Sequence, residues 1–352
     1  MHMEPRLELG ENSGLLIQEP RLTDFIVGGE DGMVGADVIN ESGNWDAYDS
    51  VHERQGGVYF DSMGCASFSA NRTLQKRLNF QLDHNQLPVE IVARCIELGF
   101  IVDGRFNFSD RYLAKVSGTT RKGNYFVNVW DAIRKYGLVP EATWPFDAYA
   151  RNPVFDWDDY YAAIPQSVMD IGQEFLKMFD VTYAWLVAGG SATDKQFESW
   201  LKVSPIQIGT ATCPGWNSSD VVNSCGNPVN HAITLSSLVG SKKRIVDHYS
   251  PFVKELSSDY SIPFAIRGIA SPKSTYDGSA VIDSSFGKKF AGKMLLAPED
   301  RGSLWYVVPD GKRIKIGQKS EEVATFLKAV NDRKVPVTGM TNANLSKIAI
   351  IK

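Results

Sequence analysis

The sequence predicts an α+β protein, with a mainly helical first half, a β-rich second half and a small module at its C-terminal end. Apolar residues recur at helical intervals from Met63 to about residue 202. After Pro205, short β-type runs alternate with Gly, Ser, Asn and Pro. Because the helices precede the strands along the chain, we expect two facing lobes, one helical and one β-rich.

The composition is typical of a globular protein and excludes several other classes. Of the 352 residues, 43% are hydrophobic and 22% are charged, which is enough apolar material for a sizeable core. The formal net charge of −4 provides no basic excess for binding nucleic acid or anionic membranes. No apolar run approaches the ~20 residues of a membrane-spanning helix, and residues 1–14 do not resemble a secretory signal.

Helical periodicity and capping residues divide the first half into elements. Helices are expected from Met63 onward, at 89–98, at 110–116, at 124–136 and over most of 156–202. Pro88 suits the first turn of the second helix, and Ser109 can cap the third. Gly137 is placed to end the fourth helix in a left-handed conformation.

The second half is expected to form short strands, followed by a separate module. The strands are predicted at 206–208, 232–235, 244–246 and 264–266. The C-terminal module is predicted to contain strands at 293–297, 304–308 and 313–316 and a helix from Ser320 to about Val330. The expected domains are an N-terminal segment packed on its neighbour (1–50), a main domain (51–270), a linker (271–279) and the small α+β module (280–352).

Four residues could together carry out nucleophilic chemistry. Cys65 opens a predicted helix, where unpaired N–H groups and the helix dipole favour a thiolate and lower the thiol pKa. His231 opens a strand of the other lobe and could take the thiol proton. Asp247 ends a strand that can return antiparallel beside His231 and orient its ring. Gln55 and the backbone N–H of Cys65 could stabilise an oxyanion.

The order of these motifs resembles that of the papain-like cysteine peptidases. They are a Gln, then Cys-x-x-Phe-Ser, then Asn-His-Ala, then a carboxylate 16 residues later. The segments 124–146 and 197–209 are also similar to that family, so the resemblance covers roughly residues 50–270. It implies that Cys65 is the nucleophile, His231 the general base and acid, Asp247 the orienting residue and Gln55 the oxyanion donor. It further implies a peptide or protein substrate and no cofactor.

The chain departs from the family pattern at several positions. Gln55 precedes Cys65 by ten residues where six are usual, and Tyr59 at the six-residue position is an alternative oxyanion donor. Ala66 replaces the usual Trp, Ser62 replaces a disulfide cysteine, and Asp247 begins Asp-His-Tyr where Asn-Ser-Trp is typical. These departures resemble the divergent bacterial and phage members more than the lysosomal enzymes.

The resemblance also implies where a substrate would bind. Residues 117–123 would line the groove and pair with an extended peptide, with Gly118 and Gly123 allowing close approach and Asn230 contributing beside His231. Residues 305–313 resemble a motif of small modules on bacterial and phage surface proteins, which implies binding to an envelope or virion component. Alternatively, Trp305 and Tyr306 only build a small core. The protein is expected to be made in the cytoplasm. Its site of action stays open between three alternatives: the cytosol, the surroundings after cell lysis, or a phage particle.

Two other functions are compatible with the same residues. The altered motif spacing suits a degenerate peptidase that only binds peptides, and the same triad serves a thiol amidase or transpeptidase acting on cell-wall peptides. Cys213 and Cys225 flank a Gly- and Asn-containing loop and either form a disulfide or stay reduced. Cys95 lies on the apolar stripe of a predicted helix, where we expect it to be buried and inert. The spacing of Cys and His residues fits no metal site.

Overall fold

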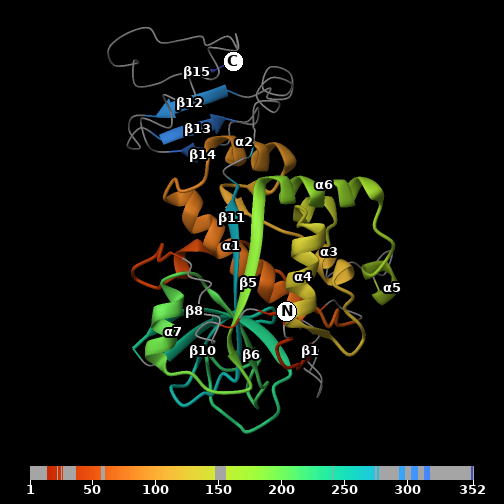
Figure 1. The fold of residues 1–352 in the computed structure, drawn as a ribbon, viewed down its shortest axis with the longest axis vertical. Helices are drawn as coiled ribbons and strands as arrows, with labels where there is room; N and C mark the ends of the chain where they lie inside the picture. Colours follow the sequence, from red (N-terminus) through yellow and green to blue (C-terminus); the bar gives the residue numbers. More distant parts are fainter. Residues whose placement is uncertain are drawn as a thin grey trace, which may run out of the picture. The chain divides into compact units, whose positions relative to one another are not determined.

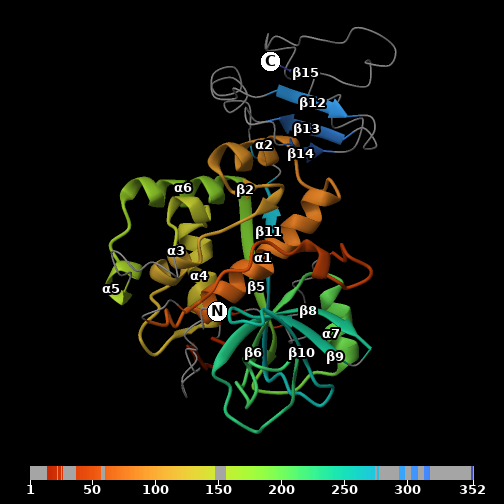
Figure 2. The ribbon, with the colours of Figure 1, turned by 180° about the vertical axis from the view of Figure 1, so that it is seen from behind.

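The structure is a computed structural model, shown from opposite sides in Figures 1 and 2. It describes residues 14–21, 23–24, 26, 37–56, 60–146, 156–240, 242–273 and 276, and the backbone of 293–297, 303–307, 313–317 and 350–351. The chain forms two compact units, one of Met1–Arg77 with Phe108–Ser271 and the other of Leu78–Asn107 with Pro272–Lys352. The described residues contain no helix that is long and apolar enough to cross a membrane.

Most of the expected helices are present among the described residues, and local capping determines several of their ends. They are α1 (Cys65–Asp83), α2 (Val89–Leu98), α3 (Asp110–Val116), α4 (Phe126–Tyr136), α5 (Trp157–Tyr160), α6 (Gln166–Met178) and α7 (Asp194–Leu201), with short 3-10 turns at Asp46–Tyr48 and Glu141–Thr143. Ser109 caps α3, accepting a hydrogen bond of 3.1 Å from the Tyr112 N–H. Gly137, with a φ of 73°, ends α4 as expected.

Within the described residues, the first unit contains a seven-stranded sheet in the order β5-β11-β6-β8-β9-β10-β7. These strands are β5 (Phe179–Ala188), β6 (Ile206–Thr210), β7 (Val221–Val222), β8 (His231–Val239), β9 (Lys242–Val246), β10 (Val253–Leu256) and β11 (Phe264–Pro272). The four strands expected in this region are confirmed as β6, β8, β9 and β11. Strands β8 and β9 are antiparallel, with Thr234 opposite Val246, so the end of β9 lies near the start of β8.

The helical and β-rich parts of this unit confirm the α+β class. In both views α3 to α6 gather apart from β8, β9 and β10, while the long strands β5 and β11 run between them (Figures 1 and 2). The sheet contains His231 as the first residue of β8, and Cys65 is the first residue of α1. The candidate residues of the two halves are thereby brought into one unit.

Two expectations for the secondary structure were wrong, and some strands were missed. Residues 179–188 form β5 and not a helix, because Phe179, Val181 and Tyr183 are buried in alternation with exposed polar side chains. Asn124 and its neighbour form the short strand β4 (Asn124–Tyr125) before α4, where a helix start was expected. Strands β7 and β10 were not expected.

The second unit contains α2, the hairpin of β2 (Ile101–Val102) and β3 (Arg105–Phe106), and a four-stranded sheet among its described residues. That sheet has the order β14-β13-β12-β15, with bounds Arg313–Gly317, Ser303–Val307, Lys293–Ala297 and Ile350–Ile351. The three strands expected in the C-terminal module are therefore confirmed to within a residue or two. The helix expected from Ser320 lies outside the described residues. Cys95 is fully buried in α2, as expected.

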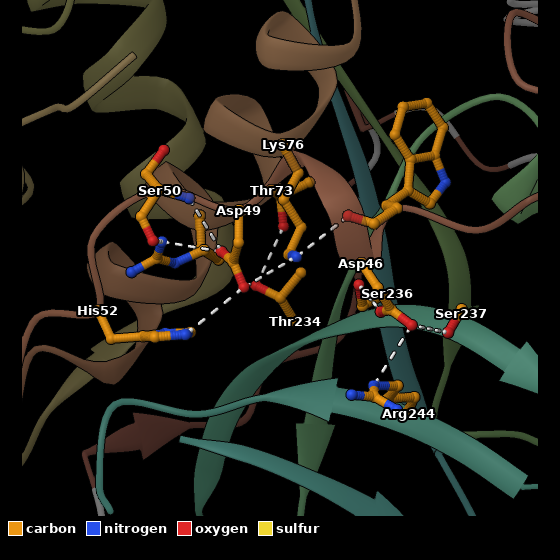
Figure 3. Close-up of polar contacts among 12 residues, drawn as sticks. Asp46, Asp49, Ser50, His52, Thr73, Lys76, Thr234, Ser236, Ser237 and Arg244 are labelled. Atoms are coloured by element: carbon orange, nitrogen blue, oxygen red, sulfur yellow. Dashed lines mark hydrogen bonds and ion pairs between the residues drawn. The ribbon is translucent and has the colours of Figure 1, made fainter. Parts of the chain in front are cut away.

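Within the first unit, hydrogen bonds and ion pairs hold residues 45–52 against α1 and the sheet (Figure 3). The Trp45 indole is completely buried and donates a 2.7 Å hydrogen bond to the Leu201 carbonyl. Asp49 pairs with two side chains of α1, at 2.9 Å from Arg72 and 3.0 Å from Lys76. Because Lys76 is entirely buried, Asp49 supplies the negative charge that this ammonium requires.

Candidate active site

Cys65 is the first residue of α1 and is completely buried. Backbone N–H groups of Ala66 and Ala232 bind its sulfur and lower the thiol pKa, as the helix start predicts. Burial nevertheless outweighs them, and the charges of Asp61 and Asp247 act with it, so the pKa of the Cys65 thiol is raised above its ordinary value. The expected lowering of this pKa was wrong, because the loss of hydration exceeds the effect of two N–H groups.

His231 is the first residue of β8 and is also completely buried. Its Nε2 lies 2.8 Å from Asp247 Oδ1, while Nδ1 has no hydrogen-bond partner among the described residues. The next residue, Ala232, binds the Cys65 sulfur through its N–H. The structure therefore places Asp247 against one ring nitrogen of His231 and the residue after His231 against the Cys65 sulfur. The other ring nitrogen has no hydrogen-bond partner among the described residues.

Asp247 follows the last residue of β9 and accepts four hydrogen bonds at full burial. Oδ1 receives the His231 bond and the His248 N–H at 2.7 Å, whereas Oδ2 receives the Trp216 indole N–H at 2.6 Å and the Lys254 ammonium. Burial alone would raise the pKa of Asp247, but its interactions with His231 and Lys254 hold it well below its ordinary value. Asp247 is therefore a carboxylate with a fixed orientation.

Trp216 and Lys254 are site residues that the sequence did not reveal. Trp216 lies in the loop between Cys213 and Cys225, which form a disulfide, so the pairing left open by the sequence is present. Lys254 lies in Val-Lys-Glu-Leu, a strand whose charged residues would ordinarily face solvent. No local sequence signal distinguishes a buried lysine there from an exposed one.

Gln55 is completely buried and tied to the segment before Cys65. Its backbone N–H donates to the His248 carbonyl at 3.1 Å, and its Nε2 donates to Asp61 Oδ1 at 2.8 Å. The Tyr249 hydroxyl binds the other oxygen of Asp61. This geometry occupies one amide hydrogen of Gln55 and leaves the second for another acceptor. Tyr59, the alternative oxyanion donor, lies outside the described residues.

The residues expected to bind substrate contact a strand of the chain itself. Strand β1 (Leu15–Leu16) pairs parallel with β4, and the Asn124 N–H donates to the Gly14 carbonyl at 2.8 Å. On its other side, the Leu15 N–H donates to the Asn230 carbonyl at 3.0 Å. Gly123, with a φ of 102°, approaches so closely that a Cβ would lie 1.9 Å from the Gly14 oxygen. β1 thus runs between the predicted substrate-binding backbone and the residue before His231.

Gly118 is not part of this contact. Its φ of 77° requires a left-handed backbone, but a Cβ there would meet no atom within 4 Å. Gly123 and Asn230 are therefore the two expected binding residues that the structure places against β1. Among the described residues, no group of three or more His, Cys, Asp or Glu side chains is arranged to hold a metal ion.

The structure is similar to solved cysteine proteases at low identity. The bromelain protease from Ananas comosus in complex with the E64 inhibitor is 14% identical with a TM-score of 0.40, and the match covers 65% of this chain and 97% of that one. Xylellain, a cysteine protease from Xylella fastidiosa, is 13% identical with a TM-score of 0.48, covering 73% and 95%. The digestive procathepsin L2 proteinase from Tenebrio molitor larval midgut is 11% identical with a TM-score of 0.45, covering 74% and 78%. No protein-family model and no curated protein matches the chain.

Proposed function

We propose that the protein is a papain-like cysteine peptidase that cleaves peptide bonds through an acyl-enzyme on Cys65. The observation that carries this proposal is the arrangement of three buried side chains. Asp247 holds Nε2 of His231, Nδ1 has no other partner among the described residues, and the residue after His231 binds the Cys65 sulfur. A nucleophile, a base and a group that orients the base are the components of nucleophilic acyl transfer.

Each residue has a role in the proposed reaction. The Cys65 sulfur attacks the scissile carbonyl carbon as its proton passes to His231, and the Cys65 N–H with the second amide hydrogen of Gln55 stabilises the oxyanion. His231 then gives the proton to the leaving amine, and the thioester forms. In deacylation His231 takes a proton from water, the hydroxide attacks the thioester, and the acid leaves as the Cys65 thiol is restored.

The contacts of β1 suggest how an extended substrate would bind. A peptide that pairs with the backbone of Asn124 and the Asn230 carbonyl would use the groups that β1 now uses. We therefore propose that β1 occupies part of the substrate position and contributes to the burial of Cys65. A substrate would have to displace β1, so releasing it should raise the reactivity of the thiol.

Gly14→Val is expected to release β1 and increase both Cys65 alkylation and peptide turnover by about tenfold or more, which corresponds to about 1.4 kcal/mol. A Cβ at Gly14 would lie 2.6 Å from the Met63 carbonyl oxygen, and its φ of 97° disfavours any side chain. Gly104→Val is the control, because Gly104 also has a positive φ but no atom within 4 Å of its Cβ position. Rates that stay the same or fall in Gly14→Val would show that β1 does not cover the site.

The proposed activity is tested by alkylation at mildly acidic pH, followed by mass spectrometry. Cys95 is an internal control, because Cys65 and Cys95 are both outside the disulfide and completely buried, and burial raises the pKa of each thiol. We expect iodoacetamide or an epoxide to modify Cys65 and spare Cys95, and the preference to vanish in His231→Ala. Equal and slow modification of the two thiols would contradict the activation of Cys65 by His231 that the mechanism requires.

A second candidate function is peptide binding without catalysis. The raised pKa of the Cys65 thiol favours it, because a neutral thiol is a poor nucleophile. Action on cell-wall peptides as an amidase or transpeptidase would use the same residues and differ in substrate. The bacterial or phage origin and the envelope-binding role of residues 280–352 stay predictions from the sequence.

A further inference from the structure

We propose that Lys254 is a positioning residue that cancels the charge of Asp247 and so sets the pH range in which Cys65 reacts; this inference rests on the proposed function. Lys254 lies on β10, paired with Ile245 of β9, and its side chain is completely buried. It does not touch the sulfur. It would act through Asp247 and the imidazole of His231.

The contacts of Asp247 divide between its two oxygens. Oδ1 faces the His231 ring and the His248 N–H, whereas Oδ2 faces the Lys254 ammonium and the Trp216 indole. The Lys254 ammonium also lies 5.1 Å from the centre of the Trp216 ring. The ammonium is therefore held on the side of the carboxylate away from the imidazole, where it alters the charge but leaves the bond to His231 intact.

This position has an electrostatic consequence for the reacting pair. A buried carboxylate without a counter-charge favours an imidazolium beside it and disfavours a nearby thiolate. The ammonium makes the Asp247–Lys254 pair neutral overall, so His231 faces a carboxylate dipole and not a full negative charge. Burial lowers the pKa of Lys254, and the Asp247 charge opposes that shift, which shows that the two ionised forms depend on each other.

Other titratable groups among the described residues also lie near the proposed reacting residues. They are Cys65 on α1, Asp61 before it, and His248 and Tyr249 on the hairpin between β9 and β10. Burial holds the pKa of His248 well below its ordinary value and raises that of Tyr249, so both are uncharged near neutral pH. Asp61 is hydrogen-bonded to the Tyr249 hydroxyl and to the Gln55 amide. Asp247 and Lys254 are thus the bonded ion pair next to the imidazole.

The test is the pH dependence of Cys65 alkylation by iodoacetamide in the full chain. Lys254→Met is expected to move both limbs of the profile to higher pH by about one unit, because the uncompensated carboxylate stabilises imidazolium and disfavours thiolate. Asp247→Asn should leave them close to the parent, because burial favours the neutral form of Lys254 once its carboxylate partner is lost. The double variant, with a neutral amide and a neutral side chain, should return to within about 0.3 units of the parent.

The outcomes separate this inference from the proposed function. If Lys254→Met loses stability but keeps the parental profile, Lys254 is only structural and the inference is wrong. If the profile shifts and the double variant restores it while no variant cleaves peptides, the peptidase proposal fails and the role of Lys254 stands. Should Lys254→Met not fold, Lys254→Gln supplies a second neutral side chain at the same position, and a parental profile for it contradicts the inference. A Cys65 thiol that reacts in no protein at any pH contradicts both.

Discussion

Replacing Cys65 by alanine is expected to lower peptide turnover by about 10³-fold or more, since the reaction then has no nucleophile. The fold should persist, because the substitution removes one sulfur atom at the head of α1 and leaves the bond of His231 to Asp247 untouched. The measurement is kcat/KM on an extended peptide library. Cys65→Ala is made both in the parent sequence and in the Gly14→Val variant. Circular dichroism and thermal melting check that the variant is folded.

Cys95→Ala is the matched control for this loss. Cys95 is also outside the disulfide and completely buried, but it lies in α2 within the other compact unit. Its replacement should lower stability without affecting the rate of a folded sample. A binding protein gives a different pattern, in which Cys65→Ala retains peptide affinity and the parent shows no turnover to lose.

Asp49→Ala is expected to lower the free energy of unfolding by about 3–5 kcal/mol, because it leaves two buried cations without their partner. Lys76 is completely buried and Arg72 nearly so, and both pair with the Asp49 carboxylate. Other acceptors are backbone carbonyls, such as that of Trp45 at 3.2 Å from the Lys76 ammonium. Carbonyl dipoles do not replace a full negative charge. Urea unfolding followed by fluorescence measures the loss.

Glu255→Ala provides the control for an exposed pair. Glu255 lies 2.9 Å from Lys242, but the Lys242 side chain is 54% exposed, so the expected cost is about 1 kcal/mol or less. A cost for Asp49→Ala as small as that would contradict the proposed role of Asp49 in attaching residues 45–52 to α1.

The same carboxylate should make stability depend on pH. Burial would raise the pKa of Asp49, but Arg72 and Lys76 outweigh it, so its folded-state pKa lies below the ordinary 3.8. Its stabilising contribution is therefore complete above the ordinary pKa and is lost as the pH falls toward the folded-state value. The parent should lose stability in this acidic range, and Asp49→Ala should lose less.

Local signals in the sequence predicted the elements that depend on neighbouring residues. Pro88 and Gly99 flank α2, and the Ser109 side chain caps α3, so these helices have the expected bounds. Residues 179–188 were predicted as a helix because apolar and polar residues alternate only at the start of this segment. From Tyr183 onward both faces of this strand are buried, and such a run has no period that distinguishes strand from helix.

The sequence by itself determined the α+β class, the position of Cys65 at a helix start and the return of Asp247 toward His231, because these follow from capping, periodicity and strand length. The tertiary structure decided the rest. Full burial of Cys65 raised the pKa of a thiol that its helix position alone would lower. Lys254 became a counter-charge because the β9–β10 hairpin turns it inward. Leu15 of β1 is hydrogen-bonded to Asn230, a residue far from it in the sequence. Burial and contacts between distant segments depend on the packing of the whole unit, which local residue patterns do not specify.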